Sequence, residues 1–194
     1  MPRQFTSQPT MYNGIQFRSK LEAKTAQALD ILGMLWQYEP RGYKLTNGLW
    51  YKPDFWLPQA NQFVECKGVM TESDSAKIVG LVNDTSRPIV ALSYDSAMLC
   101  MKFWNLPENS VVTYFNDDSG GLRIGRCLKC GGKWFYANCD TYACQCCGAD
   151  EGDHLLSEFA NVESATQLFN YAQEMAAHNP IYKEISDRFN NKEV

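Results

Sequence analysis

Residues 51–67, which read YKPDFWLPQANQFVECK, constrain the fold of this chain more than any other stretch. Aromatic residues crowd the first half, and residues 58–62 have the Pro- and Asn-containing composition of a turn. The last five residues alternate as in a strand, which places Glu65 and Lys67 on the same face. We therefore predict a hairpin that brings Asp54 close to Glu65.

This hairpin would gather two carboxylates and one ammonium group at the end of a strand. Carboxylate oxygens and water suit Mg²⁺, which is held by few protein ligands. A bound Mg²⁺ activates water and stabilises charge on a phosphoryl oxygen, and a nearby lysine orients that water or neutralises the developing charge. The alternative for the same residues is a hairpin that carries only an exposed salt bridge.

The order Pro53-Asp54 and then Glu65-Cys66-Lys67 resembles the PD-(D/E)xK nuclease superfamily. That superfamily also places a glutamate on a helix upstream of the motif, and here residues 17–23 (FRSKLEA) open a helical segment. The resemblance covers about residues 12–94, half of the chain. It implies an α/β fold of the restriction-endonuclease type, with a mixed sheet flanked by helices, as in phage-type junction resolvases and restriction-like enzymes.

The resemblance also implies a role for each matching residue. Asp54 and Glu65 would hold Mg²⁺ or Mn²⁺ directly, together with the backbone carbonyl of Cys66. Glu22 would act through water or a second metal, and Lys67 would orient or help to activate the attacking water. The implied activity is that of a DNA endonuclease, and because small nucleases of this superfamily often act as dimers, a homodimer is expected.

Glu22 has a second explanation that depends on local structure alone. Ser19 and Glu22 have the spacing of a capping box, which begins a helix predicted over residues 20–32 and ended by Gly33. The two explanations are compatible, because a glutamate in the first turn of a helix can also face a metal through water.

The rest of the first 120 residues also predicts an α/β arrangement. A helix over residues 75–84 precedes the apolar run 89–93, which is typical of a strand buried on both faces. The pattern predicts a crossover from strand to helix to parallel strand. Residues 95–105 are ambiguous and admit a helix, whereas residues 111–115 resemble a strand.

Two C-x-x-C-G elements follow and resemble a zinc ribbon. Each pair of thiolates can supply two of the four ligands of a tetrahedral structural Zn²⁺, and the glycines permit the tight turn behind each pair. A ribbon this small cannot build a core without metal. The predicted ligands are Cys127, Cys130, Cys144 and Cys147.

Two further cysteines lie in the ribbon, Cys139 and Cys146. Because Cys146 can replace a neighbour as ligand, the second pair is less defined than the first. Basic residues around the first knuckle are interleaved with the aromatic stretch 134–136. These groups can grip a nucleic-acid backbone and stack on unpaired bases. Alternatively, the aromatic residues pack the ribbon against the core and the charges are solvated.

The net charge of −4 is unevenly distributed. Residues 1–70 carry +3 and residues 121–150 carry +2, so the two segments with candidate chemistry are the positive ones. Residues 151–194 carry −5 and show a helical apolar stripe from 158 to 177. We predict three parts: a nuclease core over 1–120, a zinc ribbon over 121–150 and an acidic helical tail over 151–194. The tail packs on the body or pairs with a subunit or protein partner.

The sequence also predicts a location and leaves one rival function open. The first ten residues lack the apolar stretch of a signal peptide, and no apolar run is long enough to span a bilayer, so we expect a cytoplasmic protein with no membrane partner. The rival is a non-catalytic protein that binds nucleic acid on a nuclease scaffold, as an accessory factor in recombination, replication or phage defence.

Overall fold

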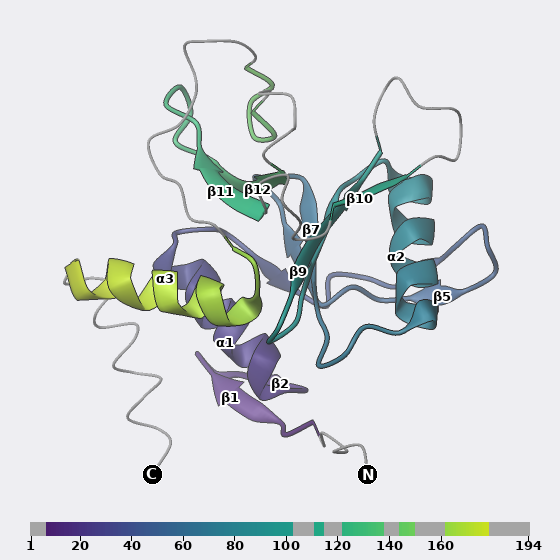
Figure 1. The fold of residues 1–194 in the computed structure, drawn as a ribbon, viewed down its shortest axis with the longest axis horizontal. Helices are drawn as coiled ribbons and strands as arrows, with labels where there is room; N and C mark the ends of the chain where they lie inside the picture. The colour runs from purple at the N-terminus through teal and green to yellow at the C-terminus, as the bar shows by residue number, and fades with distance from the viewer. Residues whose placement is uncertain (1–6, 103–110, 115–121, 138–143, 150–161, 179–194) are drawn as a thin grey trace.

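A computed structural model describes residues 7–102, 111–114, 122–137, 144–149 and 162–178 of the chain. It shows an α/β fold built on a six-stranded mixed sheet (Figure 1), which confirms the predicted mixed sheet flanked by helices. The sheet order is β10 (Val112–Tyr114), β9 (Ala97–Met101), β8 (Ile89–Leu92), β7 (Gln62–Cys66), β6 (Phe55–Leu57) and β3 (Gln37–Tyr38). Only the β7–β8 pair is parallel.

Three two-stranded hairpins lie outside this sheet. They are β1 (Thr10–Tyr12) with β2 (Ile15–Phe17), β4 (Tyr43–Lys44) with β5 (Trp50–Tyr51), and β11 (Leu122–Arg126) with β12 (Lys133–Ala137). Residues 49–56 do not form one continuous strand, because the chain is divided at residues 52–54 into β5 and β6. That division allows β5 to pair with β4 while β6 pairs with β7.

The predicted crossover is confirmed by the parallel pairing of β7 and β8 on either side of α2 (Glu72–Thr85). α2 begins three residues before its predicted start, because Thr71 and Asp74 form a capping box. All four residues of β8 are buried, as a strand covered on both faces requires.

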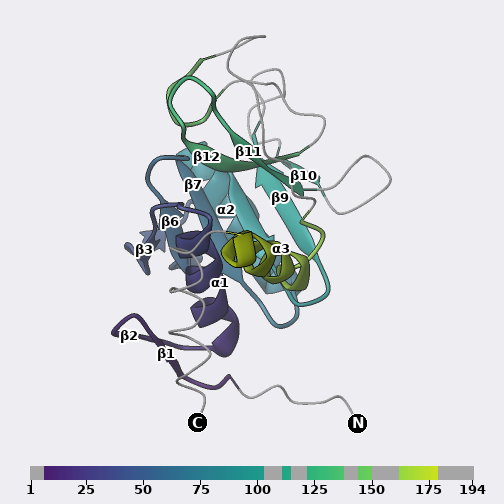
Figure 2. The same ribbon diagram turned by 90° about the vertical axis from the view of Figure 1, so that its left-hand side faces the viewer.

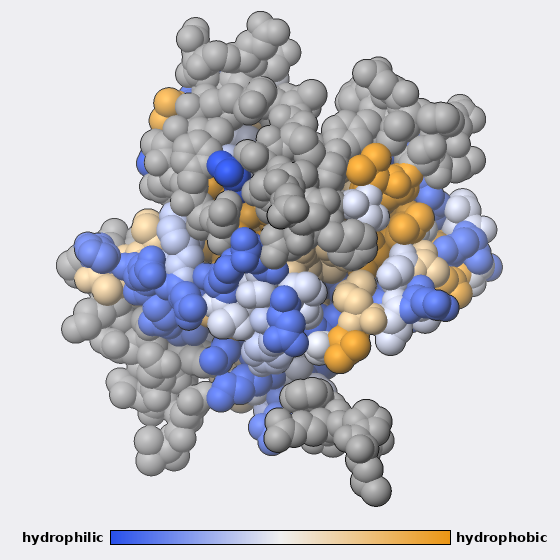
Figure 3. Space-filling view, viewed as in Figure 1, coloured by the Kyte–Doolittle hydropathy of each residue, from blue (hydrophilic) through white to orange (hydrophobic). Residues whose placement is uncertain are grey.

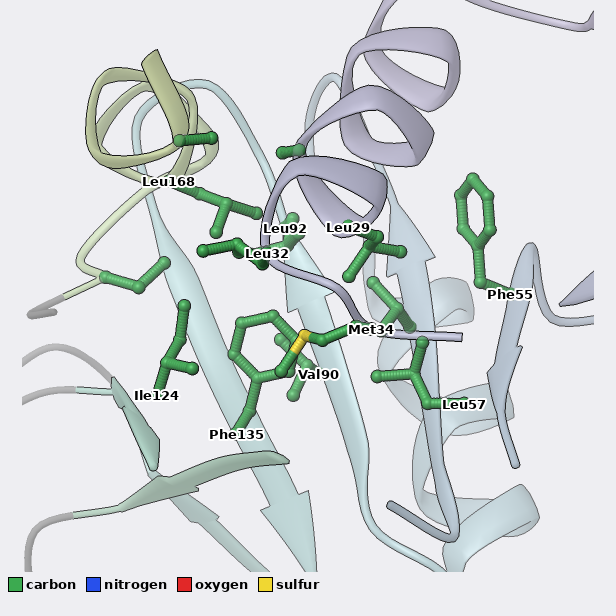
Figure 4. Close-up of a cluster of buried hydrophobic side chains, with 14 of the residues drawn as sticks. Leu29, Leu32, Met34, Phe55, Leu57, Val90, Leu92, Ile124, Phe135 and Leu168 are labelled. Atoms are coloured by element: carbon green, nitrogen blue, oxygen red, sulfur yellow. The ribbon is translucent and has the colours of Figure 1, made fainter. Parts of the chain in front are cut away.

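The two faces of the sheet build two separate apolar clusters. Val64 and Val90 join one cluster, whereas their neighbours Phe63 and Ile89 join the other. The first face is covered by α1 (Lys20–Ile31), α3 (Ala165–His178) and the ribbon strands β11 and β12 (Figure 2). The second is covered by α2 and the β4–β5 hairpin. Figure 4 shows the first cluster, where Leu29, Phe135 and Leu168 come from α1, β12 and α3.

The ribbon is fixed to the sheet by a buried amide. Gln62 Nε2 donates to the Phe135 carbonyl at 2.5 Å, and the Phe135 N–H donates to Gln62 Oε1 at 3.0 Å. Phe135 is fully buried and Trp134 is 3% exposed. The packing interpretation of these aromatic residues is therefore confirmed for both, and stacking of either ring on bases is excluded.

Residues 97–101, which lie in the stretch whose sequence was ambiguous and admitted a helix, form the strand β9. The cause is a tight turn: Ser93 N–H donates to the Ser96 carbonyl at 2.7 Å, and Ser96 N–H donates to Ser93 Oγ at 3.0 Å. This turn reverses the chain and pairs β9 antiparallel with β8.

Helix α3 is the described part of the predicted acidic tail. It packs against α1, and Leu168 and Ala172 are buried at or near the contact. The predicted boundaries near 120 and 150 lie outside the described residues. The surface of the described part is mostly hydrophilic over α1 and α3, with apolar groups around β10 and α2 (Figure 3). Among the described residues, no helix has both the length and the apolar character needed to cross a bilayer.

Candidate active site and metal centre

The predicted meeting of Asp54 and Glu65 is present in the structure. The pairing of Phe55 with Val64 places the two carboxylates on adjacent strands, and each residue is 1% exposed. Asp54 N–H donates to Glu65 Oε2 at 3.2 Å, and Cys66 N–H donates to Asp54 Oδ2 at 2.8 Å. Burying two carboxylates side by side is costly unless protons, cations or hydrogen bonds compensate them.

Lys67 lies beside Glu65 at the end of β7. Its ammonium group is 2.8 Å from Glu65 Oε1 and 3.5 Å from an oxygen of Asp74, in the first turn of α2. Burial opposes the charge of Lys67, but the nearby carboxylates, Glu65 foremost and then Asp54 and Asp74, together raise the lysine pKa. The salt bridge exists, but it differs from the exposed pair of the alternative interpretation, because Glu65 is buried.

Glu22 makes the predicted contacts with Ser19 at the start of α1. Ser19 caps α1, accepting from Glu22 N–H at 3.1 Å and donating to Glu22 Oε1 at 2.9 Å. The other oxygen, Oε2, accepts from the Tyr38 hydroxyl at 2.5 Å and from the Arg18 N–H at 3.1 Å. Glu22 is thus a buried helix-start residue that is also joined to the side chains around Asp54.

Arg18 links Glu22 to Asp54, a role that the sequence did not predict for it. Its guanidinium contacts Asp54 Oδ1, and its Nε lies 3.0 Å from Glu39 and 3.9 Å from Glu22. Glu39 is also paired with Lys52. The only signal in the sequence is that Arg18 directly precedes the helix that carries Glu22, which does not reveal a contact with Asp54.

The electrostatics around Asp54 favour an added positive charge. Burial and the neighbouring Glu65 charge raise the pKa of Asp54 to about 8. Burial likewise raises the pKa of Tyr51, whose hydroxyl lies beside Glu65 but makes no well-formed hydrogen bond to a described residue. A buried polar atom without a partner often marks a place for a water or an ion.

Cations partly balance the charge of these carboxylates. With every group ionised, the network contains five carboxylates and three cations, which leaves two negative charges. The carboxylates are Glu22, Glu39, Asp54, Glu65 and Asp74, and the cations are Arg18, Lys52 and Lys67. Among the described residues, these carboxylates do not form a tightly converging ligand set. The network can orient water and neutralise an anion, and its charge and oxygen donors suit a hard cation.

The four predicted cysteines do converge. All four sulfur atoms lie within 4.8 Å of one another, with Cys127 and Cys147 separated by 3.9 Å and Cys130 and Cys144 by 3.7 Å. Zn–S bonds of roughly 2.3 Å in a tetrahedron require sulfur separations of about 3.8 Å. This four-cysteine group is compatible with a structural Zn²⁺.

Both knuckles have the same backbone design. Gly131 and Gly148 adopt φ of 71° and 70°, a conformation that favours glycine, and their N–H groups donate to the carbonyls of Cys127 and Cys144. Cys146 is not in the converging group; its sulfur lies against Gly132, where an added Cβ would be 2.4 Å away. Cys139 lies outside the described residues.

No protein-family model matches this chain, and none of the curated proteins searched gives a significant match.

Proposed function

We propose that this protein is a metal-dependent DNA endonuclease whose core is a restriction-endonuclease-like fold of the PD-(D/E)xK type. One observation carries the proposal: Asp54, Glu65 and Lys67 meet in a buried network that Arg18 extends to Glu22. Apart from Arg18, these are the residues that the sequence motif singles out. A hairpin that only carried a surface ion pair has no need to bury two carboxylates together.

The chemistry of the network supports Mg²⁺ or Mn²⁺ as its cofactor. The donors are oxygens, the ionised network has two uncompensated negative charges, and the Tyr51 hydroxyl beside Glu65 makes no well-formed hydrogen bond within the described part of the chain. Asp54, Glu65 and the Cys66 carbonyl would hold the ion, with Glu22 acting through water or a second ion. When bound, the ion lowers the pKa of water and stabilises negative charge on phosphate oxygens.

The side chains supply the remaining functions. Lys67, already paired with Glu65, orients the attacking water. The water oxygen forms a bond to phosphorus as the bond to one ester oxygen breaks, and its protons pass to solvent and the leaving oxygen. Arg18 is 59% exposed and contacts Asp54, so occupation of the carboxylates by a metal would free the guanidinium for a phosphate.

The zinc ribbon would help to position the nucleic acid. The buried rings of Trp134 and Phe135 do not contribute, so this role depends on exposed cations such as Arg126 and Lys129. The hydrogen bonds from Gln62 to Phe135 link the ribbon to the strand that carries Glu65, which supports a fixed relation between ribbon and site.

The proposal is tested with a labelled panel of duplex, four-way junction, flap and single-stranded DNA. Purified zinc-loaded protein is incubated with each substrate, with and without Mg²⁺. The proposal predicts cleavage that requires the metal and is lost in Asp54→Asn, whose amide retains the shape of the carboxyl group. Cleavage that persists in this variant would contradict it.

One observation favours the rival, a non-catalytic nucleic-acid-binding protein on the same scaffold. Arg18 and Lys67 occupy the carboxylates, so the described residues of the network form no converging set of metal ligands. The rival predicts that every DNA in the panel survives with Mg²⁺ or Mn²⁺ while binding is retained. Lys67→Ala would then bind DNA as well as the parent protein does.

A further inference from the structure

The β4–β5 hairpin presents two faces of different character. Tyr43 pairs with Tyr51 and Lys44 pairs with Trp50, and paired residues in an antiparallel hairpin project to the same side. Tyr51 is buried in the cluster with α2, and the Tyr43 ring packs edge-on against Phe63 at 5.7 Å. The other face, with Lys44 and Trp50, therefore points away from the core.

Trp50 is held on this outer face although it is poorly covered. The side chain is 66% exposed. Its ring lies against the backbone of Gly42, since an added Cβ there would be 2.3 Å from Cζ2 and 2.9 Å from Cε2 of the indole. Only glycine permits this approach. An exposed tryptophan ring supported on one side by backbone is a preformed surface for stacking.

The charged residues of the hairpin segment itself are all cations. Residues 41–52 contain three cations, Arg41, Lys44 and Lys52, and no carboxylate. All three are exposed. Lys52 pairs with Glu39, which bridges it to Arg18, and Arg18 contacts Asp54. The hairpin is thus linked to the carboxylate network through the ion pair of Lys52 with Glu39.

We propose that the outer face of the β4–β5 hairpin binds an unpaired segment of the nucleic-acid strand next to the phosphate that is cleaved. Trp50 stacks on a base, and Lys44 and Lys52 contact the phosphates on either side. This inference rests on the proposed function, because it takes a nucleic acid as the substrate, and it adds the class of substrate: strands with unpaired nucleotides beside the cleavage point.

The chemistry of Trp50 selects unpaired nucleotides. A base inside a duplex has both faces covered by its neighbours, so an indole ring can stack only on a base that is free of the helix. The lysines alone would bind duplex and single strands alike, since phosphate contacts carry no information on pairing. Selectivity for unpaired strands should therefore depend on the ring.

The test measures binding of fluorescein-labelled DNA by anisotropy, in zinc-loaded full-length protein without Mg²⁺ so that no strand is cut. The probes are a single strand of about 12 nucleotides, comparable to the site of one single-strand-binding domain, and the same sequence as a blunt duplex. We expect Trp50→Ala to weaken single-strand binding by about 5- to 150-fold, as loss of one stacked base does. Duplex binding should change by less than about twofold.

Three further variants separate stacking from other effects. Trp50→Phe keeps an aromatic face and should retain most of the affinity. Gly42→Ala keeps the indole but displaces it, so it should weaken single-strand binding although no functional group is lost. Leu35→Ala is the control, because Leu35 is another exposed apolar residue, at 60%, outside the hairpin. It should have no effect.

Two results would overturn the inference. One is an equal loss for duplex and single strand in Trp50→Ala, which would indicate insertion into a groove. The other is single-strand binding that is absent in the parent protein or unchanged in Trp50→Ala. Failure of the nuclease proposal is seen separately: a protein that cuts none of the panel, but loses single-strand affinity in Trp50→Ala, has the hairpin site without the catalysis.

Discussion

The guanidinium of Arg18 contacts the carboxylate of Asp54 across 36 residues of chain. One member of the pair lies just before α1 and the other just before β6, so the contact holds the first helix to the central sheet. It also places a positive charge where the proposed mechanism requires a metal. The two cations then compete for the same oxygens.

Arg18→Gln should separate the stabilising contact of Arg18 with Asp54 from its competition with a metal for the same oxygens. We expect a lower melting temperature without Mg²⁺, because Asp54 and Glu22 lose their cation, and a larger rise in melting temperature on addition of Mg²⁺ than the parent protein shows. Thermal unfolding followed by circular dichroism across a Mg²⁺ titration gives both values. Arg41→Gln is the control, since Arg41 packs on Tyr43 outside the network. Equal Mg²⁺-induced shifts in the parent and Arg18→Gln would contradict competition.

The stability of the metal-free protein should fall as pH rises. The pKa of Asp54 is about 8 in the folded chain, against an ordinary value of 3.8. Between these values the folded chain keeps a proton that the unfolded chain has lost, so the free energy of unfolding decreases with rising pH across that window. Urea midpoints from about pH 6 to about pH 8.5 should show the decrease, and Asp54→Asn should flatten it. A urea midpoint that rises with pH over this range in the parent protein, but not in Asp54→Asn, would contradict the raised pKa of Asp54.

The ribbon should contribute to the stability of the core through Gln62. Its amide makes two buried hydrogen bonds with the Phe135 backbone, so Gln62→Ala leaves a donor and an acceptor unsatisfied. We expect a loss of about 2–4 kcal/mol in the free energy of unfolding, measured with urea. Gln59→Ala, an exposed substitution of the same kind, should change it by less than about 0.5 kcal/mol. Similar values for both variants would show that the two bonds do not stabilise the docked ribbon.

Adjacent cysteines offer a matched test of the zinc ligands. Cys147 belongs to the converging group and Cys146 does not. Cys147→Ser should lower the zinc content of purified protein well below one ion per chain, because the site loses a thiolate. Cys146→Ser should keep the full content. Elemental analysis measures the zinc content of each variant. The reverse pattern would assign the fourth ligand to Cys146.

Local sequence signals predicted the elements well where a short-range interaction defines them. Ser19 caps α1, the Cys-x-x-Cys-Gly spacing sets both knuckles, and the hairpin brings Asp54 to Glu65, all as expected. The network around these residues is different, because it depends on contacts between distant segments. Nothing near Arg18 in the sequence reveals its contact with Asp54.

The same limit applies to packing. An aromatic stretch beside basic residues suits either base stacking or a core. Phe135 belongs to the core, where its backbone is held by Gln62, 73 residues away. Residues 97–101 have no clear period, and only the turn from Ser93 to Ser96 shows that they form a strand.

Comparing the rates of DNA cleavage by the Lys67→Ala and Lys77→Ala variants shows whether the carboxylate network is a nuclease site. Both are partly buried lysines replaced by alanine, but only Lys67 contacts the carboxylates, whereas Lys77 lies along α2. On the substrate that the parent protein cuts best with Mg²⁺, we predict that Lys67→Ala lowers the cleavage rate by about 10²- to 10⁴-fold. Lys77→Ala should stay within about twofold. A parent protein that cuts no DNA, or a Lys67→Ala variant that cuts as fast as the parent, would contradict the assignment of this network as a nuclease site.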